Sequence, residues 1–420
     1  MGEFKTTFVE VAKRSPGVLY EPAEKNEKQR IAVLVMHSDE DYLTWVTGPE
    51  LAKRGYTVLN ANVMNKEGII FSQTDKTRSV KAAVEYLRAL PQVEKIVLMG
   101  HSGGGTLMSA YQAVAENGPQ VFQGPEKIFP YPSEEELPPA DGVMLLDSNW
   151  GNAVMQLLSL DPAVEDEHGG MLINEDLNLF NPANGFDPAG SSYSHDFIRN
   201  FQKAQSTRNI YILEYALARL MKIEAGEGNY TDDEPLIIPG SAQGFFNNKL
   251  YAQDPRLMSR TKRAHLLLHP DGTRTEEIIH SLRGPENPVS FTDSFWEGAR
   301  FLSVKTYLNS YAVRTSAEYG FDEDHLWGVE WDSTYNCPPG NMAHVKAPTL
   351  VMGMTAGWEF LASETIYDMA ASRDKTIAFV EGATHRFTPA KHLEKYEGEF
   401  GDTVATLHDF VDEWLSAGRF

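Results

Sequence analysis

Residues 95–105 read KIVLMGHSGGG, an apolar run that ends in a serine set among glycines. The apolar part has the length and composition of a strand buried on both faces of a parallel sheet. The next five residues, TLMSA, are typical of a helix. The stretch therefore predicts a strand, a tight turn and a helix, with Ser102 in the turn.

The turn has the pattern Gly-x-Ser-x-Gly over residues 100–104. A serine nucleophile in such a strained turn needs small neighbours, because a side chain two positions away would collide with the adjacent strand or helix. A glycine-rich phosphate cradle is the alternative. It needs Gly-x-Gly-x-x-Gly with an acid about 20 residues on, or Gly-Lys-Ser/Thr, and neither spacing is present. The pattern therefore favours Ser102 as a nucleophile.

The rest of the chain shows which segments build a parallel sheet. Apolar strand-like runs alternate with helical patterns, which is typical of βαβ units. We predict further strands at 31–38, 56–63, 142–147, 349–354 and 376–380, and helices at 48–54, 78–90, 363–371 and 403–415. The alternation stops over residues 150–340, where the patterns predict helices at 209–223 and 293–309 and a hairpin of 264–268 with 275–282. The fold is therefore expected to be α/β, with a discontinuous core of residues 1–149 and 341–420 and an inserted, mainly helical cap, residues 150–340.

A second motif, Gly-Ala-Thr-His at 382–385, follows the last predicted strand. Together with the Ser102 turn it resembles the α/β-hydrolase superfamily over the two core segments, and the resemblance does not extend to the cap. It implies the α/β-hydrolase fold, a mostly parallel sheet with helices on both faces, and a catalytic triad in the chain order Ser, acid, His. His385 is then the base, because an imidazole can take the serine proton near neutral pH and return it to the leaving group.

The acid of this triad has two candidates. Glu359 is the only carboxylate in the turn after the predicted strand 349–354, where the superfamily usually places an aspartate. Asp147, after the strand that follows the nucleophile strand, occupies an alternative acid position of the superfamily. A carboxylate at either place would fix the imidazole tautomer and stabilise its protonated form. We take Glu359 as the first choice and Asp147 as the second.

An acyl-transfer site also needs two backbone N–H donors for the oxyanion that forms on the substrate carbonyl. Gly103, directly after the nucleophile, is expected to supply one. The segment His-Ser-Asp-Glu-Asp-Tyr at 37–42 resembles the superfamily's oxyanion segment. We assign the second donor to the N–H of Asp39, with Ser38 as the alternative. The hydroxyl of Tyr42 could contact the substrate, or its ring could pack beneath the cap.

The composition argues against several function classes. The chain of 420 residues has 37 Lys and Arg against 59 Asp and Glu, a net charge of −22, and such a surface repels phosphate backbones and anionic lipids. We therefore expect no nucleic-acid or membrane partner. Residues 1–15 lack the apolar segment of a signal peptide, so a cytoplasmic protein is expected. Cys337 is the only cysteine, so no Cys-x-x-Cys pair is possible, and neither a metal nor a cofactor is predicted.

The predicted cap should face Ser102 and set the substrate. Its aromatic residues suit a bulky, largely apolar acyl or leaving group, although most aromatic residues of a cap form its own core. They include Phe245, Phe246, Phe291, Phe295, Trp296, Tyr307, Tyr311, Trp327 and Trp331. The sequence thus predicts a serine esterase or lactonase for a small-molecule substrate. The alternatives are hydrolysis of a C–C bond in a β-diketone-like substrate or of an amide, acyl transfer, and a non-catalytic ligand receptor, and homo-oligomer formation is left open.

Overall fold

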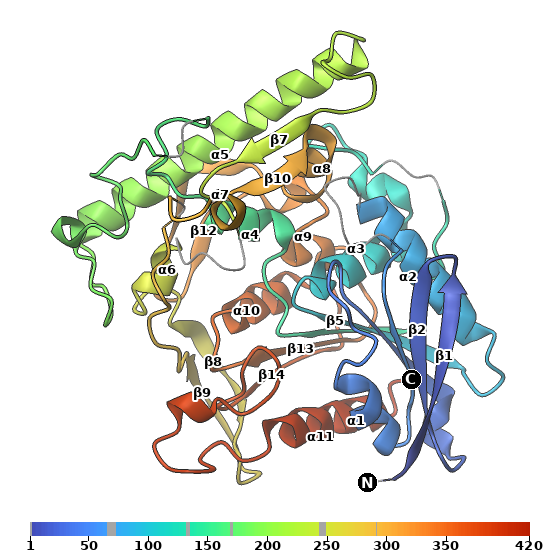
Figure 1. The fold of residues 1–420 in the computed structure, drawn as a ribbon. Coiled ribbons are helices and arrows are strands. Elements are labelled where there is room, and N and C mark those ends of the chain that lie inside the picture. The colour runs from blue at the N-terminus through green and yellow to red at the C-terminus, as the bar shows by residue number, and fades with distance from the viewer. Residues whose placement is uncertain (1, 65–72, 132–134, 169–170, 243–248, 291) are drawn as a thin grey trace.

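The computed structural model describes residues 2–64, 73–131, 135–168, 171–242, 249–290 and 292–420. Its centre is a ten-stranded sheet built from these residues (Figure 1). In spatial order the strands are β1 (Phe4–Ala12), β2 (Ser15–Pro22), β4 (Thr57–Ala61), β3 (Ile31–Met36), β5 (Lys95–His101), β6 (Gly142–Leu146), β13 (Thr349–Met354), β14 (Lys375–Val380), β8 (Arg260–Leu268) and β9 (Arg274–His280). From β4 to β8 all neighbours are parallel, and the strands outside them pair antiparallel.

The central strands are buried on both faces because apolar side chains occupy successive positions. In β3, Leu34 points into one hydrophobic cluster and Val33 into the other. Helices cover both faces (Figure 1): α2 (Gln73–Arg88), α3 (Gly104–Asn117) and α10 (Phe360–Met369) pack on one, and α1 (Thr47–Lys53) and α11 (Thr403–Ser416) on the other. This is the α/β-hydrolase fold, and the fold class predicted from the sequence is confirmed.

The predicted core elements differ from the observed ones mainly at their ends. Each strand predicted from an apolar run is present, with bounds that change by at most two residues, and the four predicted core helices form. The N-terminal hairpin of β1 and β2 was not predicted. Most of β1 is exposed and it lacks an apolar run, so the pattern that identifies a buried strand is missing there.

Apart from β8 and β9, the chain between β6 and β13 forms helices and short strands that lie beside the sheet (Figure 1). Its elements are α4 (Asn152–Leu158), α5 (His195–Glu224), β7 (Pro235–Ile238), α6 (Leu250–Gln253), α7 (Phe295–Gly298), β10 (Arg300–Ser303), α8 (Val304–Ser310), β11 (Thr315–Phe321), β12 (Leu326–Val329) and α9 (Pro338–Met342). α5, β7 and α8 share an apolar cluster of their own. The helix predicted at 209–223 is the second half of α5. The helix predicted at 293–309 is replaced by α7, β10 and α8, because residues 300–303 pair with β7.

The predicted hairpin forms, but it does not belong to the cap. β8 runs parallel to β14, with Leu266 to Leu268 opposite Ala378 to Val380, so the hairpin extends the central sheet. The predicted cap of 150–340 is therefore wrong over residues 260–280, which are part of the core. A hairpin pattern identifies two strands that pair with each other, but it does not show which sheet they join.

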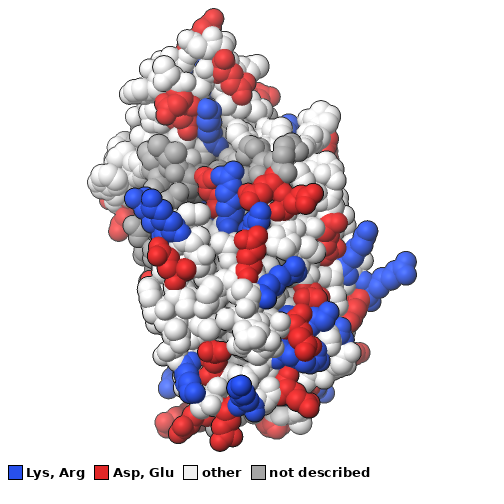
Figure 2. All heavy atoms as spheres, turned by 90° about the vertical axis from the view of Figure 1, so that its right-hand side faces the viewer, with Lys and Arg blue, Asp and Glu red and all other residues white. Residues whose placement is uncertain are grey.

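Two surface features bear on possible partners. Acidic and basic side chains are interspersed on the face shown in Figure 2. In the described parts of the chain, no helix is long and apolar enough to cross a bilayer.

Short 3-10 helices at Glu27–Arg30, Pro119–Phe122, Pro182–Asn184, Trp331–Ser333 and Lys391–Leu393 complete the secondary structure of these parts.

Candidate active site

Ser102 lies in a left-handed turn between β5 and α3. Its φ is +53°, a conformation that costs a residue other than glycine about 1 kcal/mol or more. The surrounding backbone holds this conformation: the Ser102 N–H donates to the carbonyl of Asp147 (3.3 Å), and the Ser102 carbonyl accepts from the N–H of Gly105 (3.1 Å). The side chain is partly exposed at the end of a buried strand. The strained turn expected from the sequence is present.

The glycines around Ser102 leave no room for side chains. A Cβ on Gly100 would lie 2.6 Å from the carbonyl oxygen of Gly104, and one on Gly104 would lie 2.5 Å from that of Met36. A Cβ on Gly103 would lie 2.7 Å from Oγ of Ser38. The turn therefore packs directly against the segment that follows β3, where the second oxyanion donor was expected.

His385 follows β14 and its imidazole is hydrogen-bonded to Asp147. Nδ1 of His385 and Oδ2 of Asp147 are 2.7 Å apart, and the Asp147 side chain is completely buried. Its other oxygen, Oδ1, accepts from the N–H of Met354 (2.8 Å). His385 keeps 31% of its side chain accessible, so its ring faces a space that solvent reaches. A buried carboxylate thus orients an accessible imidazole.

Glu359, the first choice for the acid, lies beside His385 and Asp147 but is not hydrogen-bonded to His385. Its Oε1 is 3.7 Å from Nδ1 of His385, and its Oε2 accepts from the N–H of Trp358 (3.2 Å). The structure therefore replaces Glu359 by Asp147 as the hydrogen-bonded partner of His385. The physical reason is that Asp147 is fixed at the end of β6, next to the nucleophile strand, whereas Glu359 starts α10 and folds back on its own turn.

The two carboxylates set the charge state of the imidazole. Burial alone would lower the pKa of His385, but the charge of Glu359 and the hydrogen bond and charge of Asp147 outweigh it and raise the pKa to about 9. Burial raises the pKa of Asp147, which the hydrogen bond from His385 opposes. The site thus favours the imidazolium form of His385 near neutral pH.

The predicted oxyanion donor Asp39 is occupied by another contact. Its N–H donates to Nδ1 of His37 (3.0 Å), as does the N–H of Glu40 (2.9 Å). Burial lowers the pKa of His37 to about 4, so its Nδ1 is a bare acceptor. Asp39 is thus wrong as the second donor. The alternative, Ser38, lies against Gly103, and neither of these two N–H groups has an acceptor in the described part of the chain.

The polar groups of the Asp39 and Tyr42 side chains are bonded to other residues of the protein. The Asp39 carboxylate accepts from the Ser38 hydroxyl (2.5 Å) and pairs with Lys76 (2.7 Å), whose side chain is 1% exposed. Burial would raise the pKa of Asp39, but Lys76 outweighs it and the pKa is lowered. Tyr42 is 4% exposed and its hydroxyl is hydrogen-bonded to Nδ1 of His101. The expected contact of the Tyr42 hydroxyl with a substrate is therefore wrong, and the ring stacks on His37 and Trp45 in the core of the sheet domain.

The aromatic residues near the triad differ from those expected in the cap. Phe245, Phe246 and Phe291 lie outside the described residues. The other six divide between the cap's own cluster (Tyr307, Tyr311), the outer surface (Phe295, Trp296) and positions at or near the main core (Trp327, Trp331). The rings beside Glu359 are instead those of Trp150, Trp358 and Tyr251, with centroids 6.4 and 5.4 Å from Trp358.

One group of potential metal ligands occurs within the described ranges. His101, Asp147 and His385 each bring a ligand atom within 4.8 Å of the others. Both ring nitrogens of His101 and Nδ1 of His385 already have hydrogen-bond partners in the protein. A metal ion would have to displace these bonds, so the arrangement fits a hydrogen-bonded triad better than a metal centre.

The comparisons with known proteins find distant structural similarity and no match in sequence. No protein-family model matches the chain, and no curated protein matches it in sequence. Similar solved structures include a hypothetical protein from Pseudomonas aeruginosa (14% identity, 99% of this chain and 94% of that one, TM-score 0.44) and the monoacylglycerol lipase of Paleococcus ferrophilus (14%, 99% and 99%, 0.41). The α/β hydrolase GrgF from Penicillium sp. sh18 is also similar (12%, 99% and 98%, 0.40). At this identity and score the assignment of the α/β-hydrolase fold rests on the strand order and the serine turn of this chain.

Proposed function

We propose that the protein is a serine hydrolase in which Ser102 is the nucleophile, His385 the general base and Asp147 the acid of the triad. The observation that carries the proposal is the left-handed Ser102 at the end of β5, hydrogen-bonded through its N–H to the residue whose carboxylate orients His385. A strained serine next to a buried aspartate that orients an accessible imidazole is costly to maintain, and nucleophilic catalysis accounts for each part of this arrangement.

The chemistry proceeds in two halves. Neutral His385 accepts the hydroxyl proton while Oγ of Ser102 attacks a carbonyl carbon, and the N–H groups of Gly103 and Ser38 receive the oxyanion. The imidazolium then protonates the leaving alcohol, which departs as the acyl-enzyme forms. In the second half, neutral His385 takes a proton from a water molecule as that water attacks the acyl-enzyme carbonyl. The imidazolium then returns the proton to Oγ of Ser102, whose bond to the acyl carbon breaks, and the carboxylic acid is released. Asp147 holds the imidazole tautomer throughout.

The substrate proposed is a carboxylic ester or lactone with a largely apolar body. Esters need no more than the triad and the oxyanion donors, because their leaving alcohol takes its proton from His385. Trp358, next to Glu359 in the chain and partly exposed, can offer its indole ring to such a body, and the buried rings of Trp150 and Tyr251 pack against it.

The first experiment is covalent labelling of the folded chain with a fluorophosphonate, read as intact mass. We expect one adduct on the wild type, none on Ser102→Ala, and full labelling of Ser109→Ala, because Ser109 is a buried serine on α3, the helix that follows the Ser102 turn. A folded wild type without an adduct would refute the proposal.

A panel of esters, lactones, amides and β-diketones, scored by product analysis, then defines the reaction. Acid and alcohol as the only products support ester hydrolysis. Products that incorporate an added alcohol would assign acyl transfer, and cleaved C–C bonds would assign that reaction instead.

A further inference from the structure

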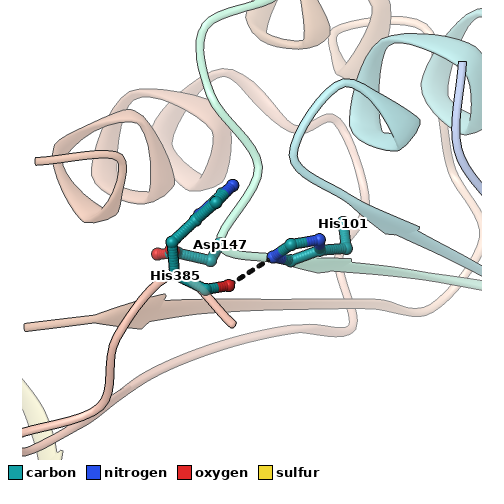
Figure 3. Close-up of side chains that lie close together, drawn as sticks. All are labelled: His101, Asp147 and His385. Carbon is teal, nitrogen blue, oxygen red and sulfur yellow. Dashed lines mark hydrogen bonds and ion pairs between the residues drawn. The ribbon is translucent and has the colours of Figure 1, made fainter. Parts of the chain in front are cut away.

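His101, directly before the nucleophile, has both ring nitrogens committed. Its side chain is 2% exposed. Nε2 lies 2.6 Å from the backbone oxygen of His385 (Figure 3), and Nδ1 is hydrogen-bonded to the hydroxyl of Tyr42. A carbonyl oxygen only accepts, so Nε2 carries the proton. Burial holds the pKa of His101 well below its usual range, so the ring is neutral and its bare Nδ1 accepts from Tyr42.

The ring of His101 is also held in one orientation by its neighbours. It stacks on Trp45 with centroids 4.6 Å apart, meets the edge of Phe387 at 4.8 Å, and lies 4.4 Å from the imidazole of His385. Trp45 and Tyr42 come from the segment after β3, and Phe387 from the loop of His385. Three segments of the chain therefore meet at this one imidazole.

We propose that His101 is a positioning residue for the catalytic base: it ties the backbone of His385 to the nucleophile turn, and Tyr42 fixes the tautomer that makes this bond. The inference rests on the proposed function. His385 is then held at two points, its ring by Asp147 and its carbonyl by His101. Because His101 precedes Ser102 directly, the second bond sets the separation of base and nucleophile.

The test compares His101→Leu with the conservative His101→Gln, whose side-chain amide can still donate to the His385 carbonyl. The matched control is His408→Leu. His408 is likewise buried and packs on the same Phe387 ring (6.2 Å), but its own bonds go to Val404 and Thr47. The measurements are the second-order rate constant of fluorophosphonate labelling and, on an ester from the panel, kcat and KM.

We expect His101→Leu to be labelled about 10- to 100-fold more slowly, because a displaced base reduces the rate by about that much. On the ester, kcat should fall by a similar factor, whereas KM should stay within about twofold of the wild-type value. His101→Gln should recover most of the rate, and His408→Leu should label like the wild type. The inference would be overturned if His101→Leu were labelled at the wild-type rate, or if the control His408→Leu lost as much of the rate as His101→Leu. It would also be overturned if His101→Gln recovered none of the rate.

Tyr42→Phe keeps the experiment decisive if His101→Leu does not fold. It removes one hydroxyl from a buried ring, and loss of the bond that selects the tautomer should slow labelling about 2- to 10-fold. A wild-type rate in Tyr42→Phe would refute the role assigned to this network. A wild type that is not labelled at all would instead overturn the proposed function, and this inference with it.

Discussion

Glu359 offers the sharpest test of how the site controls its base. Its carboxylate is 3.7 Å from Nδ1 of His385 and takes no part in the hydrogen bond to Asp147. We therefore expect Glu359→Gln to keep the triad and to change only the charge around it. Because we propose neutral His385 as the general base, we expect wild-type kcat/KM to rise with pH through the raised pKa of about 9.

The size of the effect follows from the distance. Two unit charges 3.7 Å apart interact by about 4 kcal/mol at an effective dielectric constant near 20 and by about 1 kcal/mol in water. His385 is partly accessible, so we take about 2 kcal/mol, which lowers the midpoint of the pH profile by about 1.5 pH units. At pH 7 the neutral fraction of His385 then rises from about 1% to about 24%, and the variant should be faster than the wild type by about twentyfold.

The assay is kcat/KM for one ester between pH 6 and 10, on the wild type, Glu359→Gln and the control Glu381→Gln. Glu381 is near His385 in the chain, but its carboxylate pairs with His269 at 2.7 Å, so its profile should match the wild type. If Glu359→Gln loses activity at every pH, Glu359 is the orienting acid, and the assignment to Asp147 fails. An unmoved midpoint would refute the electrostatic argument.

Three further outcomes follow from the same geometry. Asp147→Asn should lower kcat by about 10³- to 10⁴-fold with little change in KM, measured by steady-state kinetics, because the imidazole tautomer is no longer fixed. Gly104→Ala, whose Cβ would meet a backbone oxygen at 2.5 Å, should lower the free energy of unfolding by about 2 kcal/mol or more in urea, and Gly284→Ala, with open space around it, by much less. Asp39→Asn should lower the free energy of unfolding by about 3 kcal/mol in the same assay, because the buried Lys76 would lose its ion pair with Asp39 at 2.7 Å.

The core strands were predictable because each one is an apolar run buried on both faces. Residues 31–36 illustrate this, since all six side chains of β3 are buried. The same rule fails for strands that lie at the edge of the sheet. β1 is largely exposed, and β9 has one fully buried residue, Ile279, so neither shows the pattern of a central strand.

The serine turn and His385 were predictable from local patterns, whereas the network around them was not. Ser102 and Gly103 belong to a turn whose pattern of glycines around a serine can be read within a few residues. His101 gave no signal of its own, because a single histidine before the serine has no spacing to test. Its partners Tyr42 and His385 are 59 and 284 residues away, and only the folded chain brings them to the two sides of one ring.

The acid shows most directly why sequence distance misled the prediction. In the parallel ladder of β5 and β6, His101 stands opposite Leu146, so the next residues of the two strands, Ser102 and Asp147, are neighbours in space. Both adopt left-handed φ values, +53° and +49°, and the carbonyl of Asp147 binds the N–H of Ser102 while its carboxylate binds His385. One residue therefore places both the nucleophile and the base. Glu359 follows β13, two strands from β5, and it has no such tie to the Ser102 backbone in the described chain. A carboxylate on β6 is held in register with the nucleophile by one strand pairing, that of β5 with β6. A carboxylate after β13 depends on a second pairing as well, that of β6 with β13, and this is the physical reason to place the acid at Asp147.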